Sequence, residues 1–114
     1  MKTDNHEVIF AIVNSGFADE AMEAARSQGV RGGTILHARG VAREDAVAFF
    51  GITIHPDKEI LMMVVEKTIR DKVLNALYRD MGMAQKAQGI VFSLPVSHVA
   101  GLVETASVED KTEG

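Results

Sequence analysis

One stretch of the chain combines residue types that bind phosphate groups. Residues 29–40 read GVRGGTILHARG, with Arg39 beside the last glycine and Arg43 shortly after it. Arginine donates paired hydrogen bonds to phosphate oxygens, and glycine lets a backbone approach a ligand or another backbone closely. Arg39 and Arg43 are therefore candidate phosphate ligands. The glycines are candidates either for the same site or for tight turns and close packing.

Other residue types that carry chemistry do not form a recognisable site. The sequence contains no cysteine, which excludes a metal site with thiol ligands. The spacing of its histidines fits no helical or hairpin metal motif, and these residues are His6, His37, His55 and His98. No serine lies in the sequence context of an activated nucleophile. We expect no catalytic residues, no metal site and a protein that is not an enzyme.

Composition and charge limit the classes of function further. The 114 residues are 46% hydrophobic and 25% charged, which is typical of one globular domain. A net charge of −4 with scattered basic residues argues against a nucleic-acid partner. No apolar run approaches the ~20 residues that span a bilayer, and the polar start does not resemble a signal peptide. We expect a cytoplasmic domain over residues 1–103, without direct membrane insertion, and a flexible acidic tail at 104–114.

The elements that must position the glycine-rich stretch follow from hydrophobic periodicity. Apolar and β-branched runs predict strands at about 7–13, 33–39, 59–65 and 89–94. Residues 41–57 show no decisive pattern, and their conformation stays open at this stage.

Helical spacing predicts two helices between these strands. The first begins near Phe17, with Asn14 or Ser15 as its cap, and ends at Gly29. The second begins after Thr68 as its cap, and its polar side, which includes Arg70, is expected to face water.

The order strand, helix, strand is therefore present twice. It predicts the ferredoxin-like βαββαβ sandwich of the α+β class, in which both helices cover one face of a four-stranded antiparallel sheet. The strands are nevertheless apolar on both sides, and Phe49, Phe50, Met62 and Met63 exceed the needs of a two-layer core. An uncovered apolar face usually meets another subunit, so we expect an oligomer.

The same residues resemble a known family, the PII-type nitrogen regulatory proteins. The similarity covers roughly residues 7–102. It rests on 29–35 (GVRGGTI), Arg39-Gly40, Lys58-Glu59-Ile60 and 89–96 (GIVFSLPV). The resemblance implies a homotrimer that binds an adenine nucleotide (AMP, ADP or ATP) in the clefts between subunits. It also implies a signalling role, in which a long loop docks on a regulated protein such as a transporter or an enzyme.

The resemblance also implies a set of site residues, matched position by position. The adenine pocket would use Ile12, Gly32, Thr34 and Val64. The base of the loop would be Gly40, Val41, Ala42, Arg43 and Glu44, and the neighbouring subunit would contribute Gly89 and Ile90.

Several of these positions depart from the pattern of the family. Glu44 stands where the family has glutamine, Ala42 replaces a glycine, and Ile90 stands where a lysine is expected. The arginines that usually follow the fourth strand fall on Gly101 and Val103. Fewer basic groups suit a shorter phosphate chain, so we expect AMP or ADP to bind at least as well as ATP. The alternatives are a ligand-free oligomeric interaction module and a CutA-like metal-tolerance trimer, which shares the fold and the trimer.

Overall fold

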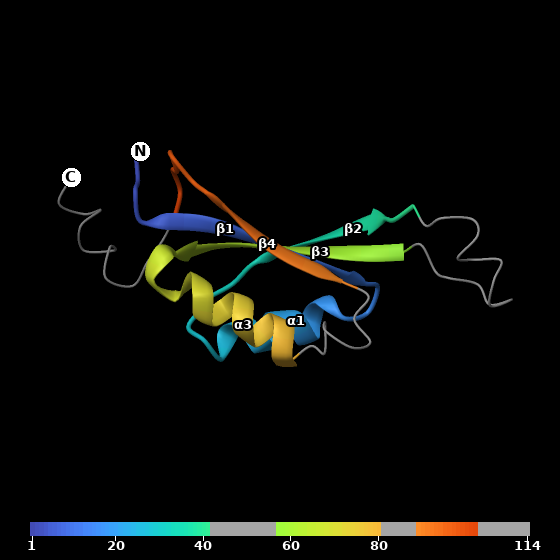
Figure 1. Cartoon of the computed structure of the whole chain (residues 1–114). Coiled ribbons are helices and arrows are strands. Elements are labelled where there is room, and N and C mark those ends of the chain that lie inside the picture. The colour runs from blue at the N-terminus through green and yellow to red at the C-terminus, as the bar shows by residue number, and fades with distance from the viewer. Residues whose placement is uncertain (42–56, 81–88, 103–114) are drawn as a thin grey trace, which may run out of the picture.

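The computed structural model describes residues 1–41, 57–80 and 89–102 of the chain. The described helices and strands follow one another in the order that the sequence predicts (Figure 1). They are β1 (His6–Asn14), α1 (Ala18–Arg26), β2 (Thr34–Arg39), β3 (Asp57–Glu66), the short 3-10 helix η1 (Lys67–Ile69), α3 (Arg70–Asp80) and β4 (Ile90–Pro95).

The four strands form one antiparallel sheet in the order β2-β3-β1-β4. Figure 1 shows α1 and α3 side by side on the same face of this sheet. The predicted ferredoxin-like sandwich of the α+β class is confirmed.

The core lies between the helices and the sheet. Alternate residues of β1 are buried, from Glu7 to Val13, and they face the helices. Leu61 and Met63 of β3 lie opposite Val73 and Leu77 of α3, and none of these four side chains is more than 1% exposed. Alanines on α1 let that helix approach the sheet closely. The expectation that Met63 is surplus to the core is therefore wrong, because it occupies the centre of the core.

The opposite face of the sheet is apolar and has no covering layer among the described residues. Its side chains form rows across the four strands, from β2 to β4. One row is Leu36, Ile60, Ile12 and Ile90, and the next is Thr34, Met62, Phe10 and Phe92. Several of these large side chains are more than a third exposed, namely Leu36, Ile90 and Phe92. We call this surface the open face.

The helix ends differ in part from the sequence prediction. Gly29 ends the first helix with a φ of +104°, as predicted. Neither Asn14 nor Ser15 caps α1 with its side chain. Instead, Oε1 of Glu59 accepts hydrogen bonds from the backbone N–H groups of Gly16 and Ala18, both at 3.0 Å. Thr68 makes no cap, because it lies inside η1.

Some predictions fall outside the described residues. These are the predictions for Ala42, Arg43 and Glu44 at the base of the loop, for Phe49 and Phe50, and for the tail at 104–114.

Candidate functional site

A cavity of about 290 Å³ lies at one corner of the sheet. It forms because β2 begins at Thr34, opposite Met62, so that the last residues of β3 pair with β1 on one side and have no strand on the β2 side. The loop that follows α1 passes along this gap instead. The cavity is lined by His6, Gly29, Val30, Arg31, Gly32, Val64, Val65, Glu66, Ile69 and Leu102.

The walls of the cavity combine an apolar part with a few polar groups. Val64, Ile69 and Leu102 supply the apolar part. The charged groups on the lining are the guanidinium of Arg31 and the carboxylate of Glu66. Ligand sites in proteins commonly have this composition, because apolar walls bind a ring and a few polar groups fix its orientation.

Two glycines line the cavity, Gly29 and Gly32, and Gly32 is the one with open space around it. A Cβ atom added to it would meet nothing within 4 Å, and its φ lies outside the left-handed range. Neither packing nor backbone conformation therefore requires glycine at this position. Two other glycines, Gly33 and Gly89, have no such space. A Cβ at Gly33 would lie 2.9 Å from Leu61 Cδ1, and a Cβ at Gly89 would lie 2.6 Å from the carbonyl oxygen of Ile12.

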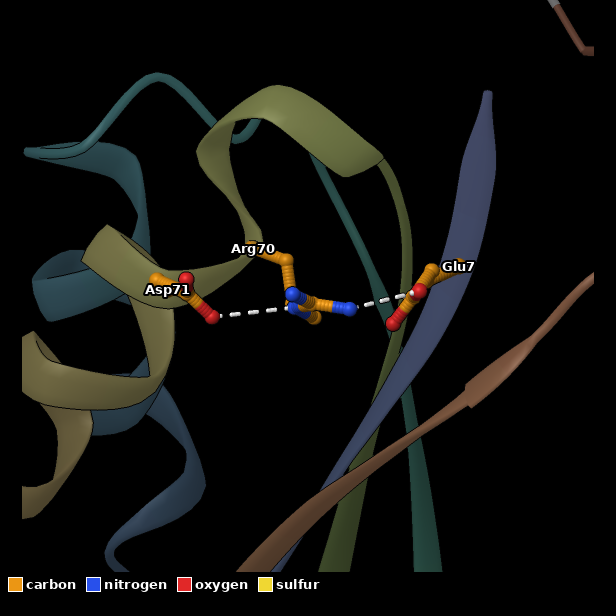
Figure 2. Close-up of polar contacts among 3 residues, drawn as sticks. All are labelled: Glu7, Arg70 and Asp71. Carbon is orange, nitrogen blue, oxygen red and sulfur yellow. Dashed lines mark hydrogen bonds and ion pairs between the residues drawn. The ribbon is translucent and has the colours of Figure 1, made fainter. Parts of the chain in front are cut away.

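An ion pair joins two residues that are adjacent in the chain to residues of the cavity lining (Figure 2). Nη1 of Arg70 donates to Oε2 of Glu7 at 2.8 Å, and Nε of Arg70 donates to Oδ1 of Asp71 at 3.0 Å. The Glu7 side chain is only 8% exposed and that of Arg70 is 30% exposed. The expectation that Arg70 faces water is therefore wrong.

The same contacts favour the charged form of the guanidinium. The hydrogen bond to Asp71, and then the negative charges of Asp71 and Glu7, raise the pKa of Arg70 above its ordinary value. The pair joins the start of β1 to the start of α3. The residues next to it in the chain, His6 and Ile69, line the cavity, so the pair holds two of its walls together.

The structure brings only some of the sequence-predicted site residues together. Gly32 and Val64 both line the cavity, and Thr34 follows directly at the start of β2. Ile12 does not join them. It lies opposite Ile60, four residues along β3 from Val64, and it pairs with Ile90 of β4, next to Gly89.

A third group lies at the far end of β2. Arg39 pairs with Asp57 in the β2–β3 register, and Gly40 and Val41 follow it. β2 spans six residues, so this group is about 20 Å from Gly32 at about 3.3 Å per residue. Within one chain, the predicted site is therefore divided among separate corners of the sheet.

Sequence reasoning did not select Arg31, Glu66 or Leu102, although all three line the cavity. Arg31 carried a usable signal, because it is an arginine within the glycine-rich stretch 29–40. Glu66 and Leu102 carried none, since each follows an apolar stretch without any local motif.

The described residues show no arrangement for metal chemistry. Within the ranges 1–41, 57–80 and 89–102, no three His, Cys, Asp or Glu side chains are grouped so that they could hold a metal ion. Among the helices of these ranges, none has the length and apolar character needed to cross a membrane.

Comparison with solved structures identifies the fold family. The structure matches the PII protein of Arabidopsis thaliana, which was crystallised bound to citrate, with a TM-score of 0.62 and 26% sequence identity. The match covers 82% of this chain and 79% of the plant protein. The chain is a divergent member of the PII-like superfamily.

A second match shows how far this fold extends beyond sequence similarity. The PII-like chain matches a DUF3240 family protein from Shewanella baltica with a TM-score of 0.64, over 89% of this chain and 100% of the other. Their sequences are only 10% identical, so this likeness concerns the fold alone. Comparisons with protein-family models and with curated proteins found no match.

Proposed function

We propose that this chain is a PII-like signalling protein that acts as a homotrimer in nitrogen or related metabolic regulation. It binds a small effector between subunits, an adenine nucleotide such as AMP or ADP, and thereby controls a protein partner such as a transporter or an enzyme. It has no enzymatic role, and we place it in the cytoplasm.

The observation that carries this proposal is the division of the site. Gly32 lies beside the β2 edge of the sheet and Gly89 and Ile90 lie at the β4 edge, with β3 and β1 between them. Val64 and Ile12 are on these two central strands, but Val64 lies opposite Val8 and Ile12 lies opposite Ile60, four residues further along β3. One chain alone cannot close a single pocket from both edges. A neighbouring copy that brings its Gly89 corner against the Gly32 corner completes such a pocket.

The open face supports the same assembly. It presents rows of aliphatic and aromatic side chains, and Phe10 of β1 stacks on Phe92 of β4 with ring centroids 5.3 Å apart. Burying apolar surface stabilises an assembly by about 25 cal/mol per Å². Polar residues border this face at its ends, with Lys58 hydrogen-bonded to Asn14 at one end and His6 opposite Glu66 at the other. An apolar centre with a polar rim is the usual composition of a subunit interface.

The proposed effector is chosen from the charge of the cavity and from the ligand of the similar Arabidopsis PII structure. The cavity supplies one guanidinium and an apolar wall, which suit a purine ring with a short phosphate chain. The citrate bound to the Arabidopsis PII protein supports the binding of a small anion in a protein of this fold. The regulatory partner is proposed from the PII resemblance, and the loop residues Ala42, Arg43 and Glu44 remain sequence predictions.

Two measurements on the whole protein test the proposal. Multi-angle light scattering is expected to give the mass of three chains at micromolar concentration. AMP and ADP are expected to raise the melting temperature, because a ligand that binds only the folded state stabilises it. A monomer mass would overturn the assembly. A trimer whose melting temperature responds to none of AMP, ADP and ATP would instead identify a ligand-free interaction module.

A further inference from the structure

The cavity beside Gly32 carries two opposite charges at fixed places. Arg31 comes from the loop after α1, and Glu66 comes from the end of β3. Among the described lining residues there is no other arginine and no lysine, and His6 is the remaining titratable group. Arg31 and Glu66 are therefore the charged residues that this chain itself offers to a ligand in the cavity.

Arg31 is held in place by its backbone and keeps its guanidinium available. Val30, directly before it, is only 6% exposed, and its N–H donates to the carbonyl oxygen of Ala25 at 3.3 Å. Among the described residues, no hydrogen bond or ion pair occupies the Arg31 side chain. Arg26, the last residue of α1, differs in this respect, because its Nη1 binds Oε2 of Glu23 at 3.0 Å.

We propose that Arg31 and Glu66 make the cavity selective for a nucleotide with a single phosphate group. Arg31 binds the phosphate, because a guanidinium matches the geometry of phosphate oxygens. Glu66 repels additional negative charge, so a triphosphate loses in repulsion what it gains in attraction. The proposal rests on the proposed function, and it adds the residues that select the ligand and the charge that they select.

The position of Gly32 agrees with this assignment. It lies next to Arg31 and leaves open space at its Cα, so a ligand ring can approach the backbone between Arg31 and the apolar wall. The base would then lie against Val64, Ile69 and Leu102, and its phosphate would lie at Arg31.

Isothermal titration calorimetry with adenosine, AMP, ADP and ATP tests the proposal on the full-length protein. The variants are Arg31→Gln, Glu66→Gln and Arg31→Lys, the last of which keeps the positive charge. Arg26→Gln is a control that also removes one exposed arginine. Arg31→Gln is expected to weaken AMP binding about tenfold or more, the usual effect of losing a charged hydrogen bond. It should leave adenosine binding unchanged. Glu66→Gln is expected to strengthen ATP binding about tenfold relative to AMP.

The controls separate selectivity from simple loss of structure. Arg26→Gln is expected to bind all four compounds like the wild type, and Arg31→Lys is expected to recover part of the AMP affinity. An equal loss of adenosine and AMP affinity in Arg31→Gln would overturn the selectivity, as would unchanged AMP binding. A wild-type protein that binds none of the four compounds would overturn the proposed function itself, which is a distinct outcome.

Discussion

Arg70 at the start of α3 binds Glu7 at the start of β1, with 2.8 Å between Nη1 and Oε2, although 63 residues separate them in the sequence. Glu7 is the one buried charged residue among the described residues. A buried carboxylate needs a partner that replaces the water it has lost. Arg70 supplies this partner and at the same time joins the sheet to the second helix beside the cavity.

Replacement of Arg70 by methionine is expected to destabilise the protein, because it leaves the Glu7 carboxylate buried without its donor. Urea unfolding is expected to show a lower midpoint for Arg70→Met than for the control Arg26→Met, which breaks an exposed ion pair. The double variant Glu7→Gln, Arg70→Met should recover part of the loss. Equal midpoints for Arg70→Met and Arg26→Met would show that the pair contributes no more than a surface contact.

Glu59 is expected to stabilise helix α1 from a distance. Its carboxylate accepts hydrogen bonds from Gly16 N–H and Ala18 N–H, and its side chain is only 13% exposed. Loss of a helix cap costs about 0.5–2 kcal/mol. Glu59→Ala should lower the free energy of unfolding by about this amount, and Glu59→Gln by less, because its amide oxygen still accepts. Amide hydrogen exchange should accelerate at Gly16 and Ala18 in Glu59→Ala. Unchanged exchange there would contradict the capping role.

The sequence was sufficient for the order of the elements but not for the contacts between distant ones. Runs such as 7–13 and 59–65 are apolar and β-branched, and they are strands because few alternatives bury so many such side chains. The capping contact between Glu59 and Gly16 spans 43 residues. Hydrophobic periodicity shows which residues lie on the same face of one helix or strand. It does not show which residue of a distant element forms a hydrogen bond with them. The local candidates Asn14 and Ser15 were therefore predicted in its place.

The position of Met63 was missed for a related reason. In a strand that alternates apolar and polar residues, the alternation itself shows which side is buried. The run ILMMVV at 60–65 is apolar throughout, so its pattern does not distinguish Met62 from Met63. Pairing with β1 determines the answer, since Met63 lies opposite Ile9 on the helix side and Met62 lies opposite Phe10 on the open face.

The sequence predicts the candidate site only where a residue type alone indicates a role. Gly32, Gly33 and Gly89 are chemically identical in the sequence, yet the structure gives them different surroundings. Only the positions of other strands decide which glycine faces a cavity and which one faces a backbone. The cavity also depends on where β2 begins, and element boundaries are the part of a fold that sequence patterns predict least well.

These surroundings predict opposite effects for two matched substitutions. Gly89→Ala places a Cβ 2.6 Å from the carbonyl oxygen of Ile12, so β4 must shift away from β1. Overpacking of this kind costs about 1–3 kcal/mol. Gly32→Ala meets nothing within 4 Å and should leave the stability nearly unchanged. Chemical denaturation of both variants measures the difference. A Gly89→Ala variant as stable as the wild type would mean that β4 adapts without cost.

The open face provides the last prediction. Phe92 lies on the edge strand β4, stacked on Phe10 of β1, and is 39% exposed in the single chain. If three copies bury this face, a lysine there loses its hydration and finds no partner among the aliphatic rows. Phe92→Lys is therefore expected to dissociate the assembly to monomers in light scattering.

The control is Tyr78→Lys on α3, which replaces an aromatic residue that is 52% exposed outside the open face. It should keep the mass of the wild type. The dissociated variant should also lose its response to AMP, since Gly32 and Gly89 of different copies no longer meet. A Phe92→Lys protein that stays trimeric would show that the open face is not the interface.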